Sequence, residues 1–179
     1  MNLLTGKEAV ARVQGIVLPK FQVHGYAVDL TVRQLFALNP AGRVDFGGGG
    51  YIPAGLIPIG VTPRHPEDRY AWWDLTRGSY YVEFNESLEL GEDEVALLEP
   101  HDRLLRAGAS HASVFLRGRA APVHALLEIG VLSLSIEQNA RLSRVLIFRL
   151  GPAAESAPRQ RAARSANPRR TRRKKSAKK

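Results

Sequence analysis

Apolar and polar side chains alternate one by one along much of the chain. The alternation is clearest in residues 28–33, 80–85 and 132–136, whereas residues 142–150 carry apolar side chains on both faces. A repeat of two places apolar side chains on one face of a β-strand. Glycine- and proline-containing turn signals separate these segments. Many short strands at this spacing predict a mainly β fold, a barrel or a sandwich, and not a βαβ fold.

The N-terminal segment departs from this alternation. Thr5 and Glu8 have the spacing of a capping box, in which the two side chains bind the free backbone N–H groups at the start of a helix. Gly15 is a suitable stop, because glycine adopts the left-handed conformation at helix ends. The sequence therefore predicts a short helix over residues 6–14.

A second short helix is predicted inside the chain. Asp102 can cap a turn that begins at Arg103, and Gly108 can end it. The segment between them is long enough for about one and a half turns at 3.6 residues per turn.

The positive charge is concentrated at the C-terminus. Residues 152–179 contain seven Arg, four Lys and one Glu, so the overall charge of +9 describes this segment and not the remainder. The segment has no apolar periodicity and cannot bury enough surface to order itself. We therefore expect two parts, a domain over residues 1–151 and a disordered basic tail over residues 152–179.

The tail could bind nucleic acid. Each phosphate that Lys or Arg neutralises releases counterions, so such a tail binds RNA or DNA without sequence choice and with strong salt dependence. A solubilising tail that meets polyanions only incidentally is the alternative. The candidate contacts are Arg169, Arg170, Arg172, Arg173, Lys174 and Lys175.

Composition excludes several kinds of site. The chain has no cysteine, which excludes disulfides, a Cys-ligated zinc ion and a Cys nucleophile. The histidines lack the spacing of a zinc site. Trp72 and Trp73 are interpreted as core and rim packing, with base stacking as the alternative. Charged residues interrupt the N-terminal apolar residues, and no uncharged apolar run could span a bilayer. We expect a cytoplasmic protein that does not enter the membrane.

Several stretches, in order along residues 3 to 150, resemble the archaeal-type dUTPases of the dUTPase and dCTP deaminase family. The resemblance implies a distorted β-barrel of the dUTPase-like β-clip type. It also implies a homotrimer with sites for a deoxypyrimidine nucleotide between subunits. The matching stretches are residues 3–8, 26–32, 42–46, 78–86, 100–109, 114–129 and 139–148.

At the positions where the family performs its chemistry, this chain has unreactive side chains. The hairpin aspartate that activates water in dUTPases is matched by Leu116, and the glutamate of the deaminases by Leu126. An aliphatic side chain cannot accept a proton or orient water. His124 and Glu128 flank Leu126 on the same strand face and are rescue candidates. Each lies roughly 6–7 Å along the strand from Leu126, too far to replace a carboxylate directly.

The phosphate-binding positions are altered as well. By resemblance, Asp102 and Arg103 occupy the place of the two serines that open the family's phosphate-binding helix, and Arg106 matches the arginine of that motif. Arg119 replaces the tyrosine beneath the deoxyribose, and Arg144 replaces a glutamine. If Asp102 caps the helix, its carboxylate occupies the anion site. The arginines could compensate for that charge.

Asp29 matches the family's first-motif aspartate, which lies near the magnesium-bound phosphates. It is therefore the candidate metal residue, with Mg²⁺ as cofactor if the protein is active. The alternative is a strand-end polar residue bonded to backbone.

Three functions follow from these residues. The first is a catalytically degenerate family member that binds a pyrimidine nucleotide or serves a structural role. The second is an active dUTP diphosphatase, which converts dUTP to dUMP and pyrophosphate with magnesium. The third is a trimer that binds nucleic acid through its basic tails, whose effects would be multivalent.

Overall fold

Strands make up most of the computed structural model, which describes residues 1–39 and 41–151. The strands of the described residues are β1 (Asn2–Leu3), β2 (Val13–Gln14), β3 (Val28–Leu38), β4 (Leu56–Pro58), β5 (Trp72–Phe84), β6 (Ser87–Glu89), β7 (Glu94–Pro100), β8 (Ala109–His111), β9 (Val114–Leu116), β10 (Arg119–Ala120), β11 (His124–Glu137) and β12 (Arg141–Arg149). The helices are α1 (Gly6–Val10), α2 (Pro19–Gln22) and α3 (Asp102–Arg106). No described helix is long and apolar enough to cross a membrane.

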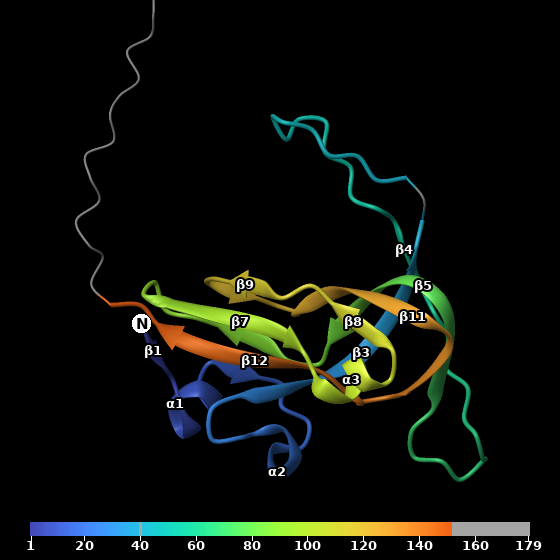
Figure 1. Cartoon of the computed structure of the whole chain (residues 1–179), viewed down its shortest axis with the longest axis horizontal. Coiled ribbons are helices and arrows are strands. Elements are labelled where there is room, and N and C mark those ends of the chain that lie inside the picture. Colours follow the sequence, from blue (N-terminus) through green and yellow to red (C-terminus); the bar gives the residue numbers. More distant parts are fainter. Residues whose placement is uncertain (40, 152–179) are drawn as a thin grey trace, which may run out of the picture.

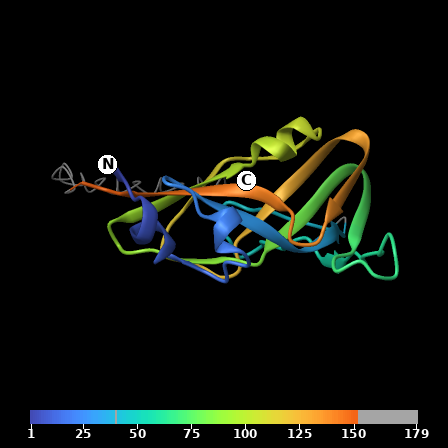
Figure 2. The ribbon, with the colours of Figure 1, turned by 90° about the horizontal axis from the view of Figure 1, so that it is seen from below.

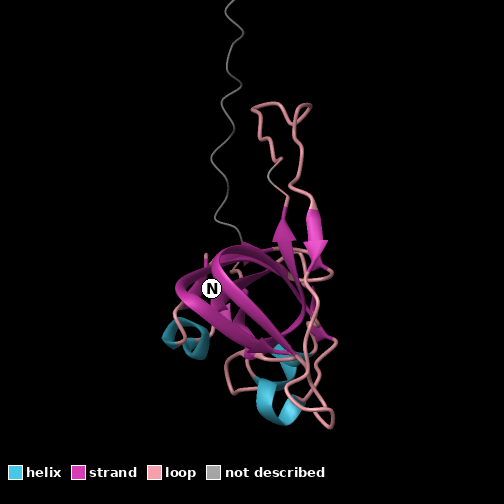
Figure 3. Cartoon of the chain, turned by 90° about the vertical axis from the view of Figure 1, so that its right-hand side faces the viewer, coloured by secondary structure: helices cyan, strands magenta, loops and turns pink. Residues whose placement is uncertain are grey.

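The strands form one large curled sheet and one small sheet. The large sheet has the order β8-β11-β5-β3-β12-β7-β9, with β1 beside β12 and β4 beside β3. The small sheet has the order β10-β6-β2. The large sheet bends around the core as a half-barrel (Figures 1 and 3). This architecture confirms the predicted mainly β fold with a distorted barrel.

The core lies inside the curl, and the alternating pattern of the sequence fills it. Along β11, Ala125, Leu127 and Ile129 are buried, whereas Leu126 between them is 49% exposed. Trp73 is completely buried and Trp72 is only partly covered, so the predicted core and rim packing is confirmed. Apolar burial of this kind is the main favourable contribution to folding.

The N-terminal helix is shorter than predicted. α1 ends at Val10, and Val13–Gln14 form β2, which pairs with β6. The predicted capping box is also wrong, because the Thr5 side chain makes no capping hydrogen bond. Pairing with β6 buries Val13 and replaces the last predicted helical turn. Tertiary pairing here outweighs a local helix signal.

A two-stranded arm, described over residues 41–62, projects from the curled sheet (Figures 1 and 3). β4 pairs with the end of β3 at its base, and further out Arg43 pairs with Ile52 through two backbone hydrogen bonds of 2.8 Å each. Phe46 near the tip is fully exposed. The arm therefore contributes little to the core.

The basic tail lies outside the described residues. The domain boundary at residue 151 and the nucleic-acid candidates Arg169, Arg170, Arg172, Arg173, Lys174 and Lys175 therefore stay predictions.

Candidate functional site

A buried carboxylate, Asp29 on β3, is the centre of a cluster of basic side chains. Its Oδ2 atom lies 2.9 Å from Nε2 of His24, 3.2 Å from Nε2 of His101 and 3.1 Å from Nη1 of Arg141. Its Oδ1 atom accepts a hydrogen bond of 3.1 Å from Nε of Arg144. The Asp29 side chain is completely buried, so these groups replace its hydration.

Sheet geometry explains why the two arginines meet one carboxylate. β12 runs antiparallel to β3, and Arg144 stands opposite Asp29. Residues three apart on a regular strand point to opposite faces. A β-bulge between Arg141 and Ser143 adds one residue to β12, and this shift returns Arg141 to the side of Arg144. The bulge therefore creates the double-arginine arrangement.

The charges in the cluster are coupled. Burial would raise the pKa of Asp29, but hydrogen bonds from His24 and Arg144 and the charge of His101 outweigh it and lower the pKa. Burial lowers the pKa of His101, and the charges of Arg144 and Arg141 lower it further against the attraction of Asp29. Two guanidinium groups and one carboxylate leave surplus positive charge here.

The surroundings of Asp29 do not fit a magnesium ion. Both carboxylate oxygens already bind nitrogen donors, and two of these donors carry permanent positive charge. Magnesium prefers oxygen ligands in octahedral geometry, usually with several waters. Among residues 1–39 and 41–151, no group of three His, Asp or Glu side chains is arranged to hold a metal. Asp29 instead neutralises and orients the arginines.

Helix α3 begins differently from the prediction. Its N-cap is His101, whose Nδ1 accepts a hydrogen bond of 3.0 Å from the backbone N–H of Arg103. The predicted capping role of Asp102 is therefore wrong. The Asp102 carboxylate is exposed and pairs with Arg106 at 3.1 Å, one helical turn on. Gly108, with φ of +85°, ends the helix as predicted.

Leu116 and Leu126, which the resemblance matches to the family's catalytic carboxylates, lie on different strands. Leu116 ends β9 and stands opposite Ala96 of β7, where it packs against the core. Leu126 on β11 stands opposite Tyr81, and Tyr81 stands opposite Phe36 of β3. Phe36 is seven residues from Asp29, which is roughly 20 Å along a strand. Within one chain, the Leu126 position is therefore remote from the Asp29 cluster.

The rescue candidates share the exposed face of β11 with Leu126, but each has another partner. His124 stacks on the ring of Tyr81 with centroids 5.1 Å apart. Glu128 accepts a hydrogen bond of 2.8 Å from the hydroxyl of Ser79. These two side chains make no hydrogen bond to each other in the described structure, and a catalytic role for either stays a prediction.

The remaining predicted phosphate residues are dispersed. Arg144 belongs to the Asp29 cluster, and Arg103 lines a nearby pocket. Arg106 is exposed in its pair with Asp102. Arg119 lies in the small sheet opposite Glu89 and is exposed. The described chain brings together only part of the set.

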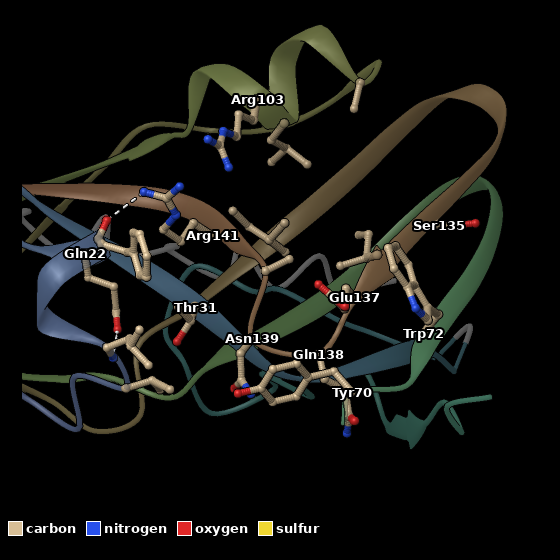
Figure 4. Close-up of a pocket in the computed structure, with 18 of the residues that line it drawn as sticks. Gln22, Thr31, Tyr70, Trp72, Arg103, Ser135, Glu137, Gln138, Asn139 and Arg141 are labelled. Atoms are coloured by element: carbon tan, nitrogen blue, oxygen red, sulfur yellow. Dashed lines mark hydrogen bonds between the residues drawn. The ribbon is translucent and has the colours of Figure 1, made fainter. Parts of the chain in front are cut away.

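Sequence analysis did not predict two features of this region, the network around Glu86 and the pocket in front of it. Glu86 is completely buried and binds Gln22 at 2.6 Å and the N–H and hydroxyl of Thr31 at 2.8 and 2.7 Å. Burial raises the pKa of Glu86, against these hydrogen bonds. Gln22 and Thr31 form part of the wall of a pocket of about 490 Å³ (Figure 4). No local motif links these residues, so only the long-range hydrogen bonds reveal them.

Comparisons with known proteins agree with the observed fold. No family model matches the chain. A probable deoxyuridine 5'-triphosphate nucleotidohydrolase of Methanosarcina barkeri is 25% identical over 138 residues, which cover 75% of this chain and 76% of that protein. A protein of the same description from Archaeoglobus fulgidus is 30% identical over 108 residues, or 60% of this chain and 58% of that protein.

A solved structure supports the same assignment at the level of fold. The 2'-deoxycytidine 5'-triphosphate deaminase of Agrobacterium tumefaciens superimposes with a TM-score of 0.61 and 17% identity. The match covers 84% of this chain but only 48% of the deaminase, so the chain spans about half of that protein's length. The chain is similar to the dUTPase and dCTP deaminase family in sequence and in fold. This chain combines the shared sheet with leucines at the two positions that the resemblance assigns to catalysis, and with a double-arginine cluster on Asp29.

Proposed function

We propose that this dUTPase-family protein binds the phosphates of a pyrimidine nucleotide at the Asp29 cluster without hydrolysing or deaminating the nucleotide. The observation that carries the proposal is the double engagement of Asp29. Arg144 binds one carboxylate oxygen, and Arg141 binds the other. A carboxylate held in this way positions cations and is not available to activate water.

The cluster has the chemistry of a phosphate site. Arginine presents planar, permanently charged N–H donors that match phosphate oxygens. The Arg141 and Arg144 side chains remain 19% and 26% exposed, so an anion can reach them. Arg144 also lies over the ring of Tyr26, with its guanidinium carbon 5.9 Å from the centroid. Tyr26 is itself half-exposed and offers a surface beside the bound phosphate.

The lack of turnover follows from the residues at the reactive positions. Hydrolysis of a phosphate chain needs a group that accepts a proton from water, and deamination needs a group that transfers protons to the base. Leu116 and Leu126 can do neither. A nucleotide could reach Glu128 or His124 only if it bound in a different position from the one that the family resemblance implies.

We further propose a homotrimer, in which a neighbouring subunit covers the Asp29 cluster. Within one chain the strand face that carries Leu126 lies roughly 20 Å along β3 from Asp29. A nucleotide that contacts both must therefore bind between chains. Analytical ultracentrifugation of the full-length protein tests this assembly, and a monomer at micromolar concentration contradicts it.

The decisive experiment combines binding and turnover on the full-length protein. Calorimetric titration with dUTP and dCTP should show binding, while pyrophosphate and ammonia should stay at background with magnesium present. Arg144→Gln should weaken nucleotide binding about tenfold, the value of one charge-assisted hydrogen bond. Arg33→Gln is the matched control, because Arg33 is exposed and pairs only with Glu83 among the described residues. Turnover above background, or equal affinities of the two variants, overturns the proposal.

An active dUTP diphosphatase is the second candidate, favoured by relatives of that description over three quarters of the chain. It would require magnesium to displace the arginines that bind both oxygens of Asp29, and Glu128 or His124 to activate water. Pyrophosphate release that is lost in Asp29→Asn and in Glu128→Gln would support it. Loss in Asp29→Asn alone would remove Glu128 from the scheme.

Nucleic-acid binding through residues 152–179 is the third candidate, favoured by the basic run in the sequence. It predicts salt-sensitive binding of DNA or RNA that disappears on deletion of that segment.

A further inference from the structure

A pocket of about 490 Å³, shown in Figure 4, is built by elements that meet only in the folded protein. Its walls come from the segment around α2, from α3, from the start of β5 and from the turn between β11 and β12. Leu116 and Leu126 do not line this pocket. The family resemblance assigns no role to most of the residues that do. Pockets of this volume accept ligands the size of a small organic molecule.

One end of this pocket is cationic. Figure 4 shows Arg103 and Arg141 together at that end, from α3 and β12. Arg141 is fixed by hydrogen bonds of 2.7 Å to the carbonyl of Phe21 and 3.1 Å to Asp29. Arg103 makes no salt bridge with any described residue, and its guanidinium is available to a ligand. Two guanidinium groups at one place favour a carboxylate, sulfonate or phosphate.

The opposite end is aromatic. Tyr70 and Trp72 line the pocket there, and each has an arginine on its ring. The guanidinium carbon of Arg64 lies 5.5 Å from the Trp72 centroid, and that of Arg69 lies 5.2 Å from the Tyr70 centroid. Arg64 is itself held by Asp74 at 2.6 Å. These contacts keep the rings in place as a preformed surface for another ring.

The pocket lining also includes aliphatic side chains and one carboxylate. Leu104, Leu134 and Leu142 line the pocket, with Leu104 and Leu142 buried, and Glu137 adds the carboxylate. A ligand that fills the pocket therefore meets arginines, aliphatic side chains and aromatic rings. A small inorganic anion would meet only the arginines.

We propose that this pocket binds an aromatic organic anion, with the anionic group on Arg103 and Arg141 and the ring against Tyr70 and Trp72. The site is additional to the nucleotide site of the proposed function, although Arg141 borders both. Its ligand needs no triphosphate and undergoes no reaction. Arg103 lies in the pocket and is not among the described residues that bind Asp29 by a hydrogen bond or a salt bridge, so it separates the two sites in a test.

Anilinonaphthalene sulfonate is a suitable probe, since it combines a fused aromatic system with one fixed negative charge. Titration of the full-length protein should give saturable fluorescence at one probe per chain. Arg103→Ala should weaken binding about tenfold, the value of one charge-assisted contact. Arg106→Ala is the matched control, because Arg106 lies on the same helix, outside the pocket, in its exposed pair with Asp102. Its affinity should equal that of the unaltered protein.

The aromatic end has its own test. Trp72→Ala should also weaken binding of the probe, whereas Phe115→Ala, at an exposed aromatic outside the pocket, should leave it unchanged. Circular dichroism establishes that each variant is folded. Equal affinities of Arg103→Ala and Arg106→Ala overturn the proposal, because the probe then binds elsewhere, for example on the exposed arm. Equal affinities of Trp72→Ala and Phe115→Ala overturn the orientation and with it the proposed ligand class.

Discussion

Arg144 donates a hydrogen bond of 3.1 Å to Asp29 across the ladder between β12 and β3. By resemblance these positions hold a glutamine and an aspartate in the family. A neutral amide beside the carboxylate leaves its charge available to a metal or to water. A guanidinium group neutralises that charge, and the bulge that brings Arg141 alongside adds a second. Relative to the pattern that the resemblance implies, these two strand positions form a cationic site in place of an acidic one.

Asp29→Asn should strongly destabilise the protein. The change leaves the guanidinium groups of Arg141 and Arg144 without their buried counter-charge. Removal of one partner from a buried ion pair costs roughly 3–5 kcal/mol. Urea unfolding measures the loss, and Asp102→Asn is the control because Asp102 forms only an exposed pair with Arg106. That control should change the free energy of unfolding by less than about 1 kcal/mol. Similar effects of the two substitutions would contradict the central role of Asp29.

Glu94 should give the protein a stability that depends on acid pH. Its carboxylate is buried, and hydrogen bonds from Arg12 at 2.7 and 2.9 Å hold its pKa at about 2, with further contributions from the Gly91 N–H and Arg149. Since the folded pKa lies below the ordinary value of 4.5, this stabilisation is complete above pH 4.5. It is lost as the pH falls from 4.5 towards 2, because the unfolded chain then binds the proton more readily.

Glu94→Gln tests this behaviour. The substitution should lower the free energy of unfolding by roughly 3 kcal/mol at pH 7. The difference from the unaltered protein should shrink steadily between pH 4.5 and pH 2. Urea unfolding at several pH values measures it, with Glu92→Gln at an exposed neighbouring site as control. A difference that is independent of pH would show that packing, not charge, explains the effect.

His101 should stabilise α3 as its N-cap. His101→Ala removes the acceptor for the Arg103 N–H and should cost roughly 1–2 kcal/mol. His101→Asn should recover part of this loss, because the asparagine side chain is a good capping acceptor. Thermal unfolding of both variants measures the effect. Equal losses would mean that contact with Asp29, and not capping, dominates.

Gly15 and Gly48 form a matched pair for backbone strain. Both have positive φ, +79° and +77°, so alanine costs about 1 kcal/mol at either position. At Gly15 a Cβ atom would also lie 2.6 Å from the carbonyl oxygen of Asn85, whereas nothing lies within 4 Å at Gly48. Gly15→Ala should therefore be clearly the more destabilising in urea unfolding. Equal effects would show that the chain around Asn85 moves aside at no cost.

The sequence by itself determined the class of fold and the chemistry that is missing. Alternation in residues 28–33 and 80–85 predicts strands because side chains on a strand point to opposite faces in turn, and β3 and β5 lie there. Gly108 ends α3 as predicted, since the left-handed conformation at a helix end is a local requirement. The leucines at positions 116 and 126 are visible without coordinates. An aliphatic side chain has no acid–base chemistry in any fold.

Only the tertiary structure decided which polar groups meet. Thr5 and Glu8 carry a valid local helix signal, yet the pairing of β2 with β6 ends the helix early because strand pairing buries Val13. Aspartate is a common helix-capping residue, which made Asp102 the predicted cap, but in the fold the neighbouring His101 is the N-cap. The contact of Asp29 with Arg141 joins residues 112 positions apart and depends on a bulge that no composition or periodicity marks. Hydrogen bonds and pockets between distant segments are set by register and packing, and these exist only in the folded chain.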